Sequence, residues 1–370
     1  MYAGLQNQWF IACRSSQLRR RPLARTVLGQ PLVLFRSSGP AAALVDRCPH
    51  RNVPLSAGRV TGERLACPYH GWEFDGQGVC RSVPGLVAAD AAATGDETAA
   101  GDETARNNEL TAEDGPAHAQ PEALNATAVP TAEQDGCVWV YHGAGAPTSP
   151  PPRFAYLGQP GYTSFSGEAT LEAALPDALE NFLDGTHTHF VHAGLIRSES
   201  GVQGRGRKDV TAIVRRGASS VEAEYPDEGQ QSGLISRLFG AGVDDVFGRF
   251  CLPSTAQLEY RAGGQLKLLI SLCFTPIDGT HQRLFAVAVG RAPAVLGALA
   301  APLIKLFFLQ ALWQDQRILR LQAANLRRFG QPRYAYTPLD LLGPHILRLL
   351  KHGPSALGET APEKRVTLRM

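Results

Sequence analysis

The chain has 370 residues, of which 44% are apolar and 19% charged, and its formal net charge is +2. This composition is ordinary for a folded soluble protein and argues against a largely disordered chain. A chain of this length usually forms two domains, and its nearly balanced charge gives no reason to expect a nucleic-acid-binding protein.

Two features bear on the compartment. The seven cysteines follow no regular spacing. Those outside the motif described below lie mostly in apolar runs, where a free thiol behaves as a small hydrophobic residue: Cys13, Cys80, Cys137, Cys251 and Cys273. Residues 1–14 lack the charged segment and apolar run of a secretory signal. We therefore expect a protein of the reducing cytoplasm.

The first elements in chain order are short strands at residues 9–13, 24–36 and 41–46, with a turn at residues 29–31. Such β-rich runs separated by turn residues are typical of antiparallel strands. They predict a small antiparallel β domain, whose last early strand leads directly into Cys48.

A motif of two cysteines and two histidines follows these strands. Cys48-Pro49-His50 is separated by sixteen residues from Cys67-Pro68-Tyr69-His70. Two thiolates and two imidazoles suit either a tetrahedral zinc or a [2Fe–2S] cluster in which histidines replace cysteines on one iron. Zinc ribbons usually pair two cysteines in each half, so this spacing fits zinc poorly. A structural zinc site or a chance cluster is the alternative.

The motif C-P-H-R followed by C-P-Y-H-G-W resembles the Rieske iron–sulfur motif of the Rieske non-haem iron oxygenases. The resemblance implies a [2Fe–2S] cluster with Cys48 and Cys67 on one iron and His50 and His70 on the other. It also implies that residues 1–145 form an N-terminal Rieske antiparallel β domain.

Residues 88–121 interrupt this pattern. They are mostly Ala, Gly, Asp, Glu and Thr, and they contain a near-exact duplication of the string G-D-E-T-A. A segment with so few large apolar residues predicts a disordered acidic insertion. Residues 128–141 resemble the stretch with which the family returns to the sheet, and the Pro-, Gly- and Ser-rich residues 143–153 predict a linker.

The second domain is expected at residues 146–370. Its alternating or apolar runs predict a largely antiparallel sheet: 162–171, 210–225, 250–261, 265–276 and 281–289. Helices are predicted at residues 177–192 and 303–328. Residues 293–313 are long and apolar enough to cross a bilayer, but Pro302, Lys305 and Gln310 interrupt them, and a charge and a proline are costly in lipid. A core or surface-lying helix is therefore preferred, and membrane association is not favoured.

The helix at residues 177–192 carries a possible second metal site. Asn181, Asp184 and His187 are spaced to share one helix face. On an ideal helix, His192 would lie about 140° round the axis from His187. The helix must therefore bend or end before His192 if both histidines are to share a site, and Gly185 is the residue where it can do so. Two histidines and one carboxylate with open positions form the facial triad that binds Fe(II) in non-haem oxygenases.

Spacing alone does not identify the carboxylate. Asp184 and Glu180 are both near, and His189 competes with either imidazole. A further candidate, Asp315, lies on the apolar stripe of the second helix. A single carboxylate on an apolar face is costly unless it is paired or bound to a metal.

The resemblance to the Rieske oxygenases selects one carboxylate among these candidates. The string N-x-x-D-x-x-H-x-x-x-x-H resembles the family's catalytic motif, and the residues around Asp315 resemble its late helix. It implies His187, His192 and Asp315 as ligands of a mononuclear Fe(II), and Asn181 and Asp184 as catalytic residues. Asp184 would bridge an iron-ligating histidine and a cluster-ligating histidine. The implied α+β fold adds a C-terminal helix-grip (START-like) domain, an antiparallel sheet with helices.

Within this family, the chain resembles the vanillate/dicamba O-demethylase-type monooxygenases. The resemblance implies O₂-dependent hydroxylation or oxidative demethylation of a hydrophobic or aromatic small molecule by a homotrimer. The chain has no G-x-G-x-x-G fingerprint after a strand. NAD(P)H would therefore act only indirectly, through a separate reductase and/or ferredoxin. Two alternatives stay open: a membrane-surface oxygenase acting on a sterol or other lipid, and a non-catalytic Rieske electron-transfer protein.

Overall fold

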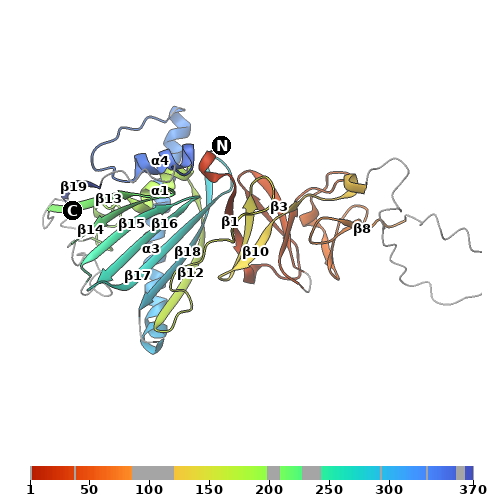
Figure 1. Cartoon of the computed structure of the whole chain (residues 1–370), viewed down its shortest axis with the longest axis horizontal. Coiled ribbons are helices and arrows are strands. Elements are labelled where there is room, and N and C mark those ends of the chain that lie inside the picture. Colours follow the sequence, from red (N-terminus) through yellow and green to blue (C-terminus); the bar gives the residue numbers. More distant parts are fainter. Residues whose placement is uncertain are drawn as a thin grey trace, which may run out of the picture. The chain divides into compact units, whose positions relative to one another are not determined.

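The computed structural model describes residues 2–36, 39–85, 121–197, 209–226, 243–291, 294–330, 332–355 and 363–369. The chain divides into a smaller unit, Trp9–Pro151, and a larger unit made of Met1–Gln8 and Pro152–Met370 (Figure 1). The first eight residues thus belong to the larger unit, although they were expected in the N-terminal domain. The predicted acidic insertion at residues 88–121 lies almost entirely outside the described residues.

The smaller unit is built from three antiparallel sheets. The strands of the first are, in order, β2 (Leu23–Val27), β3 (Gln30–Phe35), β4 (Ala42–Val45) and β9 (Ala128–Val129). Those of the second are β1 (Gln8–Arg14), β11 (Cys137–His142) and β10 (Thr131–Gln134). Those of the third are β5 (Arg59–Thr61), β6 (Arg64–Ala66), β7 (Glu73–Phe74) and β8 (Cys80–Ser82).

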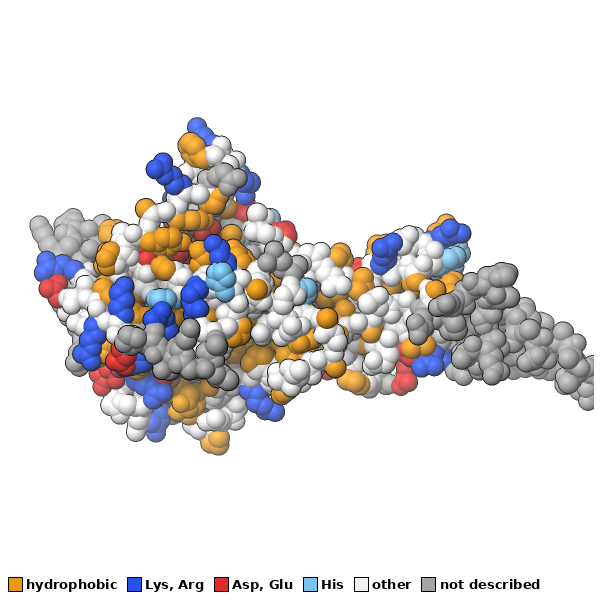
Figure 2. Space-filling model, turned by 45° about the horizontal axis from the view of Figure 1, so that its top comes forward, with side chains coloured by type: hydrophobic (Ala, Val, Ile, Leu, Met, Phe, Trp, Pro, Cys, Tyr) orange, Lys and Arg blue, Asp and Glu red, His pale blue; other side chains and the backbone are white. Residues whose placement is uncertain are grey.

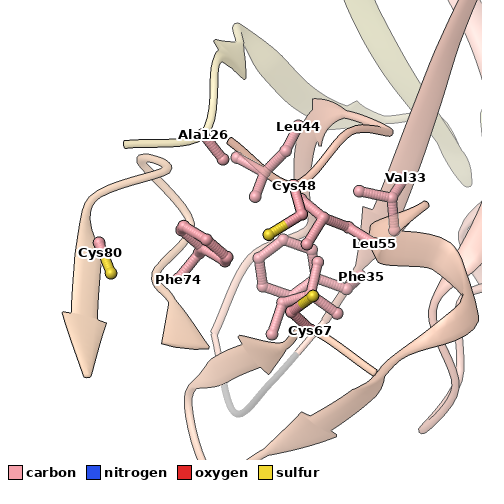
Figure 3. Close-up of a cluster of buried hydrophobic side chains, with 10 residues drawn as sticks. Val33, Phe35, Leu44, Cys48, Leu55, Cys67, Phe74, Cys80 and Ala126 are labelled. Carbon is pink, nitrogen blue, oxygen red and sulfur yellow. The ribbon is translucent and has the colours of Figure 1, made fainter. Parts of the chain in front are cut away.

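A hydrophobic cluster joins two of these sheets and surrounds two cysteines of the motif. Phe35 and Leu44 from the first sheet pack with Phe74 from the third, and each is nearly or fully buried. Cys48 and Cys67 belong to the same cluster, and Figure 3 shows their sulfur atoms among its side chains. The core therefore anchors both loops that carry the motif.

The larger unit contains one eight-stranded antiparallel sheet, as the sequence predicted. In chain order its strands are β12 (Tyr162–Glu172), β13 (Asp209–Arg216), β14 (Ser220–Tyr225), β15 (Asp245–Cys251), β16 (Thr255–Ala262), β17 (Gln265–Pro276), β18 (His281–Arg291) and β19 (Lys364–Arg369). Their order in the sheet is β12-β18-β17-β16-β15-β14-β13-β19. On the face shown in Figure 2, basic side chains of this unit are more widespread than acidic ones.

Three α-helices of the larger unit are described: α1 (Leu175–Leu183), α3 (Ala294–Phe329) and α4 (Gly343–His352). Helix α3 packs along β12, where Phe308 lies 5.0 Å from Phe165 between ring centroids and Gln316 Nε2 donates to Thr170 O at 3.1 Å. Its buried stripe includes Asp315 and Leu319, as the apolar pattern predicted. Within the described chain, no helix combines the length and the apolar character needed to cross a membrane.

The helix predicted at residues 177–192 is wrong in its extent. Helix α1 ends at Leu183, and Asp184 follows in an extended conformation with φ −78° and ψ 117°. A separate 3-10 turn then covers His187–His189. The chain therefore leaves the helix before it reaches the histidines, which places them on an irregular segment.

Candidate functional site

The first loop of the Cys/His motif connects β4 to a 3-10 turn at Leu55–Ala57. The amide of Cys48 donates to Val53 O at 2.9 Å, and the amide of Asn52 donates back to Cys48 O at 2.9 Å. Asn52 closes this loop with a positive φ of 61°, a conformation that asparagine adopts more readily than most residues. The loop therefore has a defined shape and carries His50 near its tip.

The second loop connects β6 to β7 in a similar way. Cys67 N donates to Trp72 O at 2.8 Å, and Gly71 N donates to Cys67 O at 3.1 Å. Gly71 has a φ of 72°, and a Cβ at this position would lie 3.1 Å from Pro84 Cγ. Both the backbone conformation and the close neighbour require glycine here.

The side chains of the two loops form adjacent pairs. The thiols of Cys48 and Cys67 are buried and lie within hydrogen-bonding reach, and burial raises the pKa of Cys48. The rings of His50 and His70 lie 4.5 Å apart between centroids. The structure therefore brings the two cysteines together and the two histidines together, as a four-ligand cluster site requires.

His50 has the properties of a ligand. Its Nδ1 is buried and has no hydrogen-bond partner among the described residues, and a buried nitrogen without a partner is costly unless something binds it. Trp72 stacks on the ring at 4.7 Å with an interplanar angle of 6°, which fixes its orientation. Desolvation, His70 and Arg51 lower the pKa of His50, which favours the neutral ring that metals bind.

A second constellation lies in the larger unit, where His187 and His192 meet Asp315 of α3. The two Nε2 atoms are 3.3 Å apart, and Asp315 Oδ1 lies 3.5 Å from His187 Nε2 and 3.2 Å from His192 Nε2. Among the described residues, these three form the group of His, Cys, Asp or Glu side chains that could hold a metal ion. The predicted helix break thus does turn His192 toward His187.

The other ring nitrogen of each histidine faces an oxygen acceptor. His187 Nδ1 lies 2.5 Å from the backbone oxygen of Asp184, and His192 Nδ1 lies 2.9 Å from Gln314 Oε1. A carbonyl oxygen can only accept, so each Nδ1 carries the proton and donates it. The Nε2 atom of each ring then faces Asp315, which is the arrangement that a shared metal ion requires.

Asp315 is only 4% exposed, and its partners compensate for its burial. Asn181 Nδ2 donates to Asp315 Oδ1 at 2.9 Å, so the asparagine of the motif orients the carboxylate. Burial alone would raise the pKa of Asp315, but the hydrogen bonds from His187 and His192 hold it below its ordinary value. A buried, ionised carboxylate beside two imidazoles is a suitable donor set for a divalent cation.

Asp184 contacts His187 in a different way from that expected. Its carboxylate accepts hydrogen bonds from Thr186 N and Thr186 Oγ1, both at 2.7 Å, and from His187 N at 3.1 Å. The carboxylate stays 3.8 Å from His187 Nδ1, which instead uses the Asp184 backbone oxygen. The shared helix face that predicted a carboxylate–imidazole contact does not exist, because α1 ends before Asp184. The Asp184 side chain is 32% exposed.

The rival ligands lie outside the three-residue group. His189 is buried but does not join it. Glu180 instead lines a cavity of about 300 Å³ with Asp184 and His187. Burial, with the nearby Asp340, raises the pKa of Glu180 to about 7. Sequence reasoning missed Gln314, although its position next to Asp315 on α3 was a usable signal.

Comparisons with known proteins match both parts of the chain. The model of the Rieske [2Fe-2S] domain matches residues 8–93, and the model of the vanillate O-demethylase oxygenase C-terminal domain matches residues 171–352. These ranges contain the Cys/His motif and all three members of the second constellation, respectively.

Curated relatives match over different lengths. The dicamba O-demethylase oxygenase component of Stenotrophomonas maltophilia is 32% identical over 191 residues, which cover 51% of this chain and 48% of the relative. The matched part thus spans about half of that protein's length. Aminopyrrolnitrin oxygenase PrnD of Pseudomonas fluorescens is 25% identical over 305 residues, which cover 79% of this chain and 77% of the relative.

The fold also matches solved structures. The crystal structure of dicamba monooxygenase bound to dicamba superposes with a TM-score of 0.71 and 24% identity, covering 94% of this chain and 96% of that chain. At this identity the match establishes a common fold, an N-terminal Rieske domain followed by a C-terminal sheet domain with few helices.

Proposed function

Because the chain belongs to the Rieske non-haem iron oxygenase family, we propose that it is the oxygenase component of a monooxygenase system. The smaller unit is then the Rieske domain and the larger unit the catalytic domain. The reaction is the O₂-dependent hydroxylation or oxidative demethylation of a hydrophobic or aromatic small molecule.

The ligands of the Rieske cluster are Cys48 and Cys67 on one iron and His50 and His70 on the other. The paired thiols, the paired rings and the buried Nδ1 of His50 support this assignment. The cluster supplies one-electron transfer when it is bound. Backbone hydrogen bonds within both loops hold the four side chains where they would bind the cluster.

His187, His192 and Asp315 would hold a mononuclear Fe(II). This ion supplies O₂ activation, since three protein ligands leave coordination positions open. The chain's own residues orient this donor set. Asn181 fixes one oxygen of Asp315, while the Asp184 backbone oxygen and Gln314 hold the protons of the two rings on Nδ1.

The substrate class is inferred from the names of relatives. These include dicamba O-demethylase and the methylxanthine N1-demethylase NdmA of Pseudomonas putida, which is 40% identical over 86 residues. Electrons would come from a separate ferredoxin and/or ferredoxin reductase, with NAD(P)H as the indirect source. We propose a cytoplasmic homotrimer in which Asp184 connects His187 of one subunit, through its backbone oxygen, to His70 of the next, through its carboxylate. The intact donor triad argues against a protein limited to electron transfer.

The convergence of His187 Nε2, His192 Nε2 and Asp315 Oδ1 carries this proposal. The test is O₂ consumption by reconstituted, chemically pre-reduced protein during a screen of aromatic methyl ethers and N-methylated heterocycles. We expect at least one compound to accelerate O₂ uptake and to yield a hydroxylated or demethylated product. No stimulation by any such compound, from a protein loaded with both metal centres, would contradict the proposed substrate class.

The cluster assignment makes a spectroscopic prediction. The reduced protein should give a Rieske-type electron paramagnetic resonance signal, with a potential above that of all-cysteine plant-type clusters, because neutral imidazoles replace two thiolates. Cys67→Ala should abolish the signal and leave the mononuclear iron in place. Cys13→Ala is a matched control, since Cys13 is also buried but lies outside the motif. A colourless wild-type protein containing one zinc would contradict the assignment.

Gln314 makes a second prediction. Gln314→Leu removes the oxygen that accepts the His192 Nδ1 proton, and loss of such a partner typically weakens metal binding about 10–100-fold. We expect iron to be lost to a chelator at correspondingly lower concentrations, with an unchanged Rieske signal. Gln316→Leu is the control, because the Gln316 side chain donates to the Thr170 carbonyl on β12 and lies outside the three-residue group. Equal iron affinities in the two variants would show that Gln314 does not position His192.

A further inference from the structure

The outer side of α3 exposes large apolar side chains. Leu306, Leu309 and Trp313 are 61%, 51% and 53% exposed. Their spacing of three and four residues places them on one helix face. Asp315 and Leu319, two of the buried residues of the helix, lie on its opposite side. Neighbouring exposed apolar side chains on one face are typical of an interaction surface.

Basic residues continue the same face. Arg317 and Arg320 are exposed and follow Trp313 at helical spacing, so they extend the apolar residues toward the C-terminal end of α3. Neither pairs with a carboxylate in the part of the chain that the structure describes. The sequence of α3 contains one acidic residue, Asp315, and it is buried on the other side. The α3 outer face, defined as Leu306, Leu309, Trp313, Arg317 and Arg320, is thus apolar and cationic.

We propose that the α3 outer face binds the surface of a membrane containing anionic lipids, with the helix lying parallel to the membrane plane. Apolar side chains, a tryptophan and arginines on one face, without acids, are the composition of interfacial helices. Leu306, Leu309 and Trp313 enter the boundary between headgroups and acyl chains. The long arginine side chains reach lipid phosphates, which attract each basic residue electrostatically.

A second copy of the chain that pairs through its own α3 outer face is a poorer occupant. Pairing two α3 outer faces would bury Arg317 and Arg320 of each copy, while the face supplies no carboxylate to accept them. Burying an unpaired charge is strongly unfavourable. An anionic lipid surface offers phosphate oxygens to the arginines and an apolar layer to the leucines at once. Charge complementarity therefore favours a membrane.

The test is cosedimentation of the full-length holoprotein with phosphatidylcholine vesicles, with and without phosphatidylglycerol. We expect binding to the anionic vesicles, weaker binding at high salt, and a blue shift of tryptophan fluorescence that Trp313→Phe removes. Leu306→Gln combined with Leu309→Gln should lower the partition coefficient on the order of tenfold or more, because both side chains leave the lipid. All these positions are exposed, so the variants should fold.

Matched controls separate binding by the α3 outer face from non-specific adsorption to vesicles. Arg317→Gln/Arg320→Gln should lower binding to anionic vesicles on the order of tenfold. Arg20→Gln/Arg21→Gln removes the same charge from an exposed loop of the smaller unit and should leave binding unchanged. The proposal is overturned if wild type binds no vesicles, or if both arginine pairs have equal effects. It is also overturned if the leucine variant binds vesicles as well as the wild type does. A leucine variant that binds normally but has a different oligomer mass would indicate that this face is a protein interface.

Discussion

Asp315→Ala is expected to remove the mononuclear iron and reduce turnover to background. Asp315 supplies the only carboxylate oxygen in the described three-residue group, at 3.5 and 3.2 Å from the two Nε2 atoms. Since losing a partner that merely orients a ligand weakens metal binding about 10–100-fold, losing the ligand itself should cost at least about 100-fold. Iron analysis after dialysis and O₂ uptake with substrate measure both effects. The Rieske signal should be unchanged, because its ligands belong to the other unit.

Glu180→Gln is the matched control for Asp315→Ala. Glu180 is also a partly buried carboxyl of the larger unit, but it lies outside the three-residue group and its raised pKa makes it a poor anionic donor near neutral pH. This variant should retain its iron. If Glu180→Gln lost iron while Asp315→Ala retained it, the ligand assignment would be wrong.

Asp184→Asn should abolish turnover while both metal centres stay in place. The amide preserves the shape and one acceptor oxygen, so it can still receive the hydrogen bonds from Thr186. It loses the negative charge and the second acceptor, and an amide nitrogen cannot accept from another imidazole. If Asp184 connects His187 to His70 of a neighbouring subunit, this substitution should stop electron transfer between them. Single-turnover experiments should show a reduced cluster that fails to reoxidise when O₂ and substrate are added.

A structural role for Asp184 must be separated from this bridging role. Its carboxylate caps the turn after α1, and deleting such an acceptor typically costs about 1 kcal/mol of folding free energy. Asp184→Ala should therefore lower the melting temperature, whereas Asp184→Asn should change it less. Normal cluster reoxidation in Asp184→Asn would rule out the bridge. A loss of iron in that variant would show that Asp184 acts by holding the His187 segment.

Mixed oligomers test the route between subunits. Cys67→Ala subunits lack the cluster but keep the iron site, and His187→Ala subunits keep only the cluster. Each alone should be inactive, and mixtures should regain activity if electrons cross between chains. Adding Asp184→Asn to the cluster-free subunit should remove that rescue. Mixtures without activity would indicate transfer within one chain.

The metal ligands were predictable because short motifs with fixed donor chemistry carry them. The Cys/His spacing and the family's two-histidine string needed no tertiary information. The groups that surround these donors, in contrast, could be identified only from the tertiary structure. Gln314 contacts His192 although the two lie more than 100 residues apart in the sequence. The Asp184 oxygen that contacts His187 is a main-chain atom, which any residue would supply. A helical pattern also cannot reveal where α1 stops, since Gly185 permits an end at several neighbouring positions.

The fold was predictable where one side of an element is buried. Most sequence segments that form the strands between β12 and β18 alternate apolar with polar residues or remain apolar. This is the signal that strand prediction uses. Helix α4 and strand β19 were missed, and so was most of β15, because the predicted run began only at Phe250. The strand Lys364–Arg369 has a single buried residue, Leu368, so its sequence looks like a polar tail. It belongs to the sheet because its backbone pairs with β13 from Asp209 to Val214.

The placement of the first residues has a consequence for dissecting the protein. The turn at Ala3–Leu5 packs on α4 so closely that a Cβ on Gly4 would lie 2.5 Å from Leu349 O. The smaller unit is therefore an insert, joined to the larger one at both Gln8 and Pro152. One proteolytic cut in the linker leaves the smaller unit covalently attached to residues 2–8 alone, and the packing of these residues on α4 is then what holds them to the larger unit. Trimming from the N-terminus removes packing from α4. Isolating the catalytic unit requires replacing residues 9–151 by a short bridge, so that residues 2–8 keep their place.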